Sequence, residues 1–157
     1  PMNDLPTFVD VSATPTNFDS RVQWPGKIGA IRDQQQCGAC WAFGASESFA
    51  DRYAISTGDV QVFSPEEMVS CDQGDYGCQG GYLNVANAYL VSHGVALDSC
   101  TPYTAGSGTA PACKTTCTDG SAKKLYKASA VQIATDPASI KNLIAQSGPV
   151  ETGFTVY

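Results

Sequence analysis

The chain has 157 residues and a net charge of −6; 43% of its residues are hydrophobic and 15% are charged. This balance is typical of an ordered globular protein and excludes a disordered one. No apolar run reaches the roughly 18 residues that span a bilayer, and no basic cluster favours nucleic acid. We therefore expect neither a membrane span nor a nucleic-acid partner.

The chain opens with an extended arm. Residues 1–15 contain three prolines and show no helical periodicity, which is typical of an extended segment. From about Asn17 onward, the sequence is typical of a folded, loop-rich segment. We expect residues 1–14 to be an N-terminal extension and residues 15–147 to form the first domain.

The first long helix is expected from about Cys40 to Ser56. Gly58 follows it and suits the position just beyond a helix C-cap. Apolar positions in this segment recur three and four residues apart, at Ala42, Ala45, Phe49 and Tyr53.

A second, short helix is predicted by the sequence SPEEM. Ser64 is its expected N-cap and Pro65 its first residue, and Glu67 is expected to complete a capping box with Ser64. A third helix is expected over residues 82–93, where Gly94 ends the periodic pattern.

Residues 92–135 are rich in Gly, Ser, Thr and Pro and contain three cysteines, so we expect a long loop that disulfides keep ordered. A fourth helix is expected from Asp136-Pro137 to Gly148. Beyond it, alternating residues predict a strand that is still running at the last residue, with one side formed by Val150, Thr152, Phe154 and Val156.

The seven cysteines are the most informative part of the composition. Such a density is typical of oxidising compartments, where disulfides persist. An odd count leaves one cysteine without an intramolecular partner, either for an intermolecular bond or as a reactive thiol.

The pair Cys37 and Cys40 forms a C-x-x-C motif with three possible meanings. Zinc would need two further ligands, for which Cys113 and Cys117 are the candidates, but the gap is far longer than in common zinc modules. A redox pair is expected after a strand, whereas this segment is predicted to be helical. The third meaning is a bonded cysteine beside a nucleophile.

A nucleophile at Cys40 has a physical rationale. The start of a helix favours a thiolate through its unpaired N–H groups and its positive dipole end. Gly38 and Ala39 leave room for a substrate backbone. Composition alone does not choose Cys40 over the other cysteines.

A resemblance makes that choice. The segment CGACW fits the C-G-[SA]-C-[WY] signature of papain-like proteases. The segments FDSRVQWP, IRDQ, CGACWAFGASES, FADR, CQGGY, SCTPY and SGPVE are similar, in this order, to the cathepsin B-like branch of that family. The resemblance runs from about Pro15 to the end of the chain.

The resemblance implies an α+β fold of two domains. Residues 15–147 would be mainly the helical left domain, with disulfide-stapled loops and the nucleophile. Residues 148–157 would begin the right domain, which resembles a β-barrel and normally carries the catalytic histidine and asparagine. Residues 1–14 would be an extension or the remnant of an inhibitory propeptide.

The resemblance also implies the site residues. Cys40 would be the nucleophile, and the side-chain amide of Gln34 would donate to the oxyanion together with the backbone N–H of Cys40. The residues implied in substrate binding are Gly38, Trp41, Gly80, Gly81, Tyr82 and Leu83. The disulfides implied are Cys37–Cys78, Cys71–Cys113 and Cys100–Cys117, which leave Cys40 free. No metal and no cofactor are expected.

The sequence departs from the family pattern in two places. Its single histidine, His93, lies about 50 residues beyond Cys40, whereas the catalytic histidine is expected about 130–150 residues beyond the cysteine. We therefore expect this chain alone to be inactive. In addition, residues 101–112 contain no histidine, so the histidine-bearing occluding loop of cathepsin B is absent.

The predicted function is that of a cysteine endopeptidase in a lysosomal, vacuolar or secreted location. Its expected partners are peptide or protein substrates, its own propeptide and cystatin-type inhibitors. The alternative is a disulfide-stabilised binding protein that derives from a protease and has no catalysis.

Overall fold

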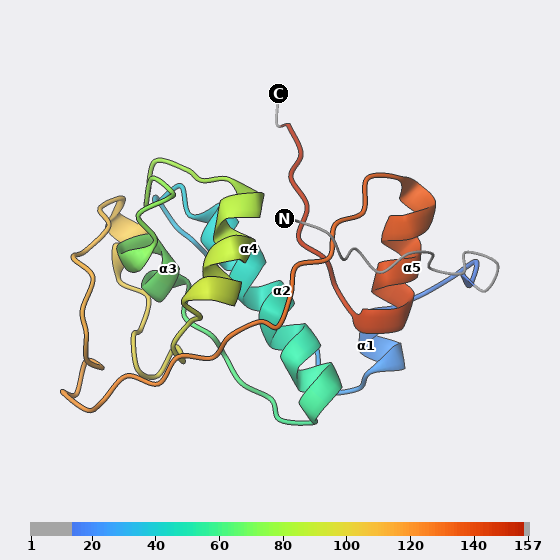
Figure 1. Ribbon diagram of the computed structural model, residues 1–157, viewed down its shortest axis with the longest axis horizontal. Helices are drawn as coiled ribbons and strands as arrows, with labels where there is room; N and C mark the ends of the chain where they lie inside the picture. The colour runs from blue at the N-terminus through green and yellow to red at the C-terminus, as the bar shows by residue number, and fades with distance from the viewer. Residues whose placement is uncertain (1–13, 156–157) are drawn as a thin grey trace.

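The computed structural model describes residues 14–155 (Figure 1). Five α-helices and one short 3-10 helix are connected by long loops. In chain order they are α1 (Ser20–Gln23), α2 (Cys40–Thr57), α3 (Pro65–Cys71), α4 (Leu83–Ser92), η2 (Ala105–Ser107) and α5 (Pro137–Ser147). The four expected helices are confirmed as α2, α3, α4 and α5, while α1 and η2 were not predicted.

Helix α2 is the centre of the fold, and α3, α4 and α5 all contact it (Figure 1). Its small buried residues let the neighbouring helices approach, and Gly58 ends it in the left-handed conformation, where its N–H donates to the carbonyl of Ala54. The core around it consists mainly of Trp41, Phe43, Phe63, Met68, Leu90 and Val95.

Helix α3 begins at the expected N-cap, but the side chain of Glu67 does not complete the predicted capping box. The Ser64 hydroxyl accepts from the N–H of Glu67 at 3.0 Å, which is one half of a capping box. The second hydrogen bond of the predicted capping box, from the N–H of Ser64 to the Glu67 side chain, is wrong, because this N–H donates to the carbonyl of Ala96. The Glu67 carboxylate instead forms an ion pair with Lys123 at 2.6 Å, with both side chains almost fully buried.

The long loop after α4 is held by covalent and polar links. Disulfides join Cys71 to Cys113 and Cys100 to Cys117, and the ion pair of Lys123 with Glu67 ties the later part of this loop to α3. The loop is thus ordered mainly through links to other segments and not by its own secondary structure.

The expected strand over residues 150–156 is not found in its described part. Residues 150–155 have no strand pairing, and the side chain of Phe154 is 85% exposed; Val156 lies outside the described residues. Alternation produces a strand only where a neighbouring strand completes the hydrogen bonds. Within residues 14–155, β-pairing is limited to isolated bridges such as Val95 with Tyr126.

The segment after α5 is held by side chains instead. The Arg52 guanidinium on α2 donates to the carbonyls of Pro149 and Gly148 at 2.8 and 3.2 Å, and Asn87 on α4 donates to the Glu151 carboxylate at 2.6 Å. Figure 1 shows this segment leaving α5 and running beside α2.

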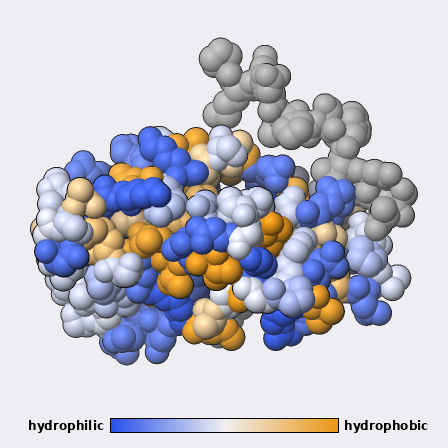
Figure 2. All heavy atoms as spheres, turned by 90° about the horizontal axis from the view of Figure 1, so that it is seen from below, coloured by the Kyte–Doolittle hydropathy of each residue, from blue (hydrophilic) through white to orange (hydrophobic). Residues whose placement is uncertain are grey.

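The surface mixes apolar and polar side chains, as the face in Figure 2 shows. Among the helices of residues 14–155, none has the length and apolar character needed to cross a bilayer.

Candidate active site

Cys40 is the first residue of α2, and its side chain is an exposed free thiol. The N-cap, Ala39, offers no side-chain acceptor and is fully buried. The N–H of Ala42 donates to the carbonyl of Ala39 at 3.0 Å, whereas the N–H groups of Cys40 and Trp41 come too early in the helix for an intrahelical acceptor and have no side-chain cap. They can therefore meet a negatively charged group beside the thiol.

The loop before Cys40 is fastened to the loop before α4. A disulfide joins Cys37 to Cys78, and the N–H of Gly38 donates to the carbonyl of Cys78 at 3.0 Å. A β-carbon at Gly38 would lie 2.6 Å from that carbonyl oxygen, so only glycine allows this approach. The link keeps Cys40 in register with the glycines that follow Cys78.

Gly80 and Gly81 differ in their surroundings. Gly80 has a φ of +103°, and a β-carbon there would meet no atom within 4 Å, so that side of its backbone is open, while its carbonyl accepts from the N–H of Tyr76 at 3.1 Å. A β-carbon at Gly81 would lie 2.6 Å from the ring of Trp41. Gly81 therefore lies directly on the indole.

Trp41 is one of the residues expected to bind substrate. Its side chain is fully buried, and its ring N–H donates to the carbonyl of Gly77 at 3.1 Å. The ring presents no surface to a ligand in this structure, and a contact of Trp41 with substrate stays a prediction. The ring supports Gly81 from inside.

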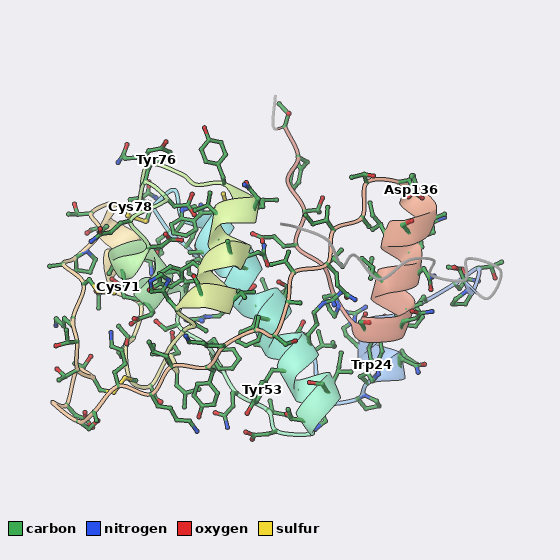
Figure 3. All side chains as sticks on the ribbon, viewed as in Figure 1. Trp24, Tyr53, Cys71, Tyr76, Cys78 and Asp136 are labelled. Atoms are coloured by element: carbon green, nitrogen blue, oxygen red, sulfur yellow. A yellow bond between two sulfur atoms is a disulfide. The ribbon has the colours of Figure 1, made fainter. Side chains whose placement is uncertain are left out.

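Tyr82 and Leu83 follow the two glycines. The Tyr82 side chain is 59% exposed, and its N–H donates to the buried carboxylate of Asp75 at 2.7 Å. Leu83 begins α4 and is half-buried against the core. Figure 3 shows Tyr76 and Cys78 on the same loop between α3 and α4. Both expected pocket residues thus lie next to Gly81, with Tyr82 the more accessible.

Gln34 lies in the loop that leads to Cys37 and is half-buried. Its carbonyl accepts from the Tyr103 hydroxyl at 2.8 Å and from the N–H of Cys37 at 3.4 Å. The next residue, Gln35, has a φ of +56°, which is uncommon for a residue other than glycine. The backbone of this loop is thus held in one specific turn.

His93 lies away from the nucleophile. It is exposed at the C-terminal end of α4, its ring is stacked on Tyr89 with centroids 4.9 Å apart, and its Nδ1 lies 2.9 Å from the Ser92 hydroxyl. Trp41 and Gly81 meet at the other end of α4, and a helix of this length extends over about 15 Å.

Sequence reasoning did not identify two buried acidic groups near the site. Burial raises the pKa of Glu151 to about 7, although Asn87 donates to its Oε2; its Oε1 has no hydrogen-bond partner among residues 14–155. Burial also raises the pKa of Asp72. The nearby Asp75 carboxylate accepts a hydrogen bond from the N–H of Tyr82. Acidic residues in loops are usually solvated, so no sequence pattern distinguishes Glu151 and Asp72 from ordinary surface carboxylates.

The disulfides of the structure are the three pairs that the resemblance implies, and they involve every cysteine except Cys40. The cysteines considered as zinc ligands, Cys113 and Cys117, are thus both bonded. Within the described part of the chain, no group of three or more His, Cys, Asp or Glu side chains could hold a metal ion.

Comparisons with known proteins agree with this geometry. Residues 14–157 match the family described as papain family cysteine protease. The chain is 42% identical over 154 residues to Cathepsin B-like CP3 of Giardia intestinalis, covering 94% of this chain and 52% of that protein. It is 36% identical over 174 residues to the gut-specific cysteine proteinase of Caenorhabditis elegans, covering 95% and 53%.

Among solved structures, proCathepsin B S9 from Trypanosoma congolense superposes with a TM-score of 0.78 at 29% identity. The superposition covers 90% of this chain and 52% of that one. The chain spans about half the length of the curated relatives it matches.

Proposed function

Because the chain belongs to the papain family of cysteine proteases and resembles its cathepsin B-like members, we propose that it supplies the nucleophile of a cysteine endopeptidase. The observation that carries the proposal is the state of Cys40. It is the free cysteine among seven, it is exposed, and it begins α2.

In the proposed reaction, the Cys40 thiol gives its proton to the group that later acts as general acid, its sulfur bonds to the carbonyl carbon of the scissile peptide, and the carbonyl oxygen takes on the negative charge. The N–H of Cys40 and the side-chain amide of Gln34 donate to that oxygen. Collapse breaks the C–N bond, and the amine leaves with a proton from a general acid. Water then cleaves the thioester and restores the thiol.

The substrate backbone would lie along Gly80 and Gly81, with Tyr82 and Leu83 beside the second residue before the scissile bond. The open space at Gly80 and the exposure of Tyr82 support this arrangement. Gly38 lies against the carbonyl of Cys78, on the same side as Gly80, and is proposed to meet the substrate through its backbone.

The general acid is proposed to be a histidine on a second domain, which residues 148–157 would begin, while residues 15–147 form the nucleophile domain. His93 is unsuited to the role because it lies at the far end of α4, stacked on Tyr89. A purified chain of residues 1–157 should therefore not turn over peptide. Turnover that His93→Ala abolishes would contradict this.

Endopeptidase activity follows from the loop over residues 101–112. It contains no histidine, and its middle part is bonded to α3 through Glu66, so it lacks the group that would hold a substrate's C-terminal carboxylate. A peptide with an amidated C-terminus should be cleaved as fast as the free acid. A strong preference for the free acid would overturn this assignment.

Three disulfides support a lysosomal, vacuolar or secreted location. Peptide and protein substrates, an inhibitory propeptide and cystatin-type inhibitors are the proposed partners. Most of the proposed propeptide remnant, residues 1–14, lies outside the described residues.

The test of the function uses the full-length protein that contains this chain. Cys40→Ala should lower kcat for a fluorogenic peptide at least about a thousandfold, and iodoacetamide should modify the wild type at Cys40 faster than a simple thiol. Unchanged turnover in Cys40→Ala would reject the proposal. Slow labelling with no turnover in the wild type would favour the non-catalytic binding protein.

A further inference from the structure

The loop that carries Gln34 is supported by residues that follow it by about 70 positions. The Tyr103 hydroxyl donates to the carbonyl of Gln34 at 2.8 Å, and the N–H of Gln36 donates to the carbonyl of Gly106 at 3.0 Å. Gly106 also lies against the side chain of Gln35. Residues 103–106 thus form the back wall of the loop over residues 34–36.

This back wall is itself held by a buried carboxylate. Oε2 of Glu66, on α3, accepts from the N–H groups of Thr104 and Ala105 at 2.6 and 3.0 Å, and Oε1 accepts from the Ser70 hydroxyl at 3.2 Å. Glu66 is only 2% exposed. Because both carboxylate oxygens are engaged, Glu66 fixes the start of η2 relative to α3.

The half-buried Tyr103 ring packs against helix α2. It packs edge-on against Phe43 of α2, with centroids 4.8 Å apart and an interplanar angle of 79°. Burial and the negative charges of Glu66 and Asp33 raise the pKa of Tyr103. The hydroxyl therefore keeps its proton at neutral pH and can donate it to Gln34.

The loop needs such support because its turn is strained. Gln35 adopts a left-handed φ of +56°, which costs free energy outside glycine and persists only where the surroundings enforce it. An oxyanion donor must also lie within a few tenths of an ångström of its place to stabilise developing charge.

We propose that Tyr103, backed by Glu66, is a positioning residue that places the Gln34 amide for oxyanion stabilisation. This inference rests on the proposed function, because it deepens the role assigned to Gln34. Neither Tyr103 nor Glu66 contacts the substrate; both act through the backbone of residues 34–36.

The test compares single variants of the full-length protein. Tyr103→Phe keeps the ring on Phe43 and removes only the hydroxyl, so kcat should fall about five- to tenfold while KM changes less than about twofold. Tyr53→Phe, at an aromatic core residue of α2 away from this loop, is the matched control and should keep the wild-type kcat. Circular dichroism measures the folded fraction of each variant, and rates are expressed per folded protein.

Two further readouts separate positioning from general structural damage. A peptide aldehyde forms a tetrahedral adduct with an oxyanion, so its inhibition constant should rise in Tyr103→Phe by about the same factor as kcat falls. Alkylation by iodoacetamide forms no oxyanion, so its rate should stay at the wild-type value. Glu66→Gln keeps an oxygen for the two N–H groups and should retain most of kcat, whereas Glu66→Ala should lose at least as much as Tyr103→Phe.

A double-mutant cycle gives the decisive outcome. If Tyr103 acts through Gln34, Tyr103→Phe should have almost no effect on kcat in a Gln34→Ala background. The same five- to tenfold loss in that background would overturn the inference, as would a wild-type kcat in Tyr103→Phe. Either result leaves the proposed function standing if Cys40→Ala is inactive, while activity in Cys40→Ala would reject the function itself.

Discussion

Gly81 rests directly on the indole of Trp41: a β-carbon at position 81 would lie 2.6 Å from ring atoms Cγ and Cδ2, and 2.9 Å from Cγ of Asp75. Carbon atoms do not approach so closely. The backbone of the proposed substrate-binding segment is thus set by a buried ring and a buried carboxylate that only glycine can approach.

Gly81→Ala should therefore damage both stability and binding. Overpacking against Trp41 should lower the free energy of unfolding by about 1–3 kcal/mol, and the displaced backbone should raise KM in the full-length protein. Urea unfolding measures the first effect. Gly29→Ala is the control, since its β-carbon would make an ordinary 3.5 Å contact; equal stability of the two variants would contradict the prediction.

Glu151 should make stability depend on pH. Burial raises its pKa to about 7 from an ordinary 4.5, so the folded state binds its proton more tightly than the unfolded state. Its contribution is complete below about pH 4.5 and is lost as the pH rises to about 7. The loss should be on the order of 2 kcal/mol after allowing for the part of the side chain that water reaches.

Urea unfolding between pH 4.5 and pH 8 checks this prediction for Glu151→Gln. The variant resembles the protonated acid, so its stability should fall less steeply with pH than that of the wild type. Val22→Ala changes an exposed side chain that carries no ionisable group and should leave the slope unchanged. Parallel curves for Glu151→Gln and the wild type would show that this carboxyl does not titrate as stated.

The disulfide Cys37–Cys78 should matter for activity beyond its effect on stability. Its replacement by two alanines removes the link between the nucleophile loop and the glycines, so kcat/KM should fall more than about tenfold at a temperature where the variant is folded. Replacement of Cys100 and Cys117, whose link lies outside the proposed site, should cost stability only. The measurement is kcat/KM per titrated thiol, with folding monitored by circular dichroism.

The ion pair of Lys123 with Glu67 should be costly to break from one side. The two side chains are 7% and 4% exposed, so Lys123→Met leaves a buried carboxylate without its partner, at a cost of about 3–5 kcal/mol in unfolding free energy. Arg21→Ala removes an exposed pair with Asp19 and should leave stability unchanged within error. Similar urea midpoints for the two variants would refute the prediction.

The helices could be predicted because their signals are local. Ser64 forms the expected N-cap, Asp136 caps the start of α5, and Gly58, expected one position beyond the C-cap, is itself the C-cap of α2. The period of the apolar residues in α2 likewise depends on neighbours along the chain.

The remaining features depend on residues far apart in the sequence. Glu67 bonds Lys123 instead of completing its capping box, and Glu66 holds residues nearly 40 positions away; sequence periodicity carries no information about such partners. The burial of Trp41 and the absence of strand pairing after Val150 have the same origin, since each is decided by what lies opposite.

The neighbouring residues Glu66 and Glu67 bind opposite ends of the long loop over residues 104–123. The first secures residues 104 and 105, the second secures Lys123, and the disulfides from Cys113 and Cys117 divide the stretch between them. Insertions within the exposed turn over residues 118–121, between Cys117 and Lys123, are therefore mechanically isolated from Cys40. A protein built in this way can acquire or shed an additional surface loop there while its reaction centre stays unchanged.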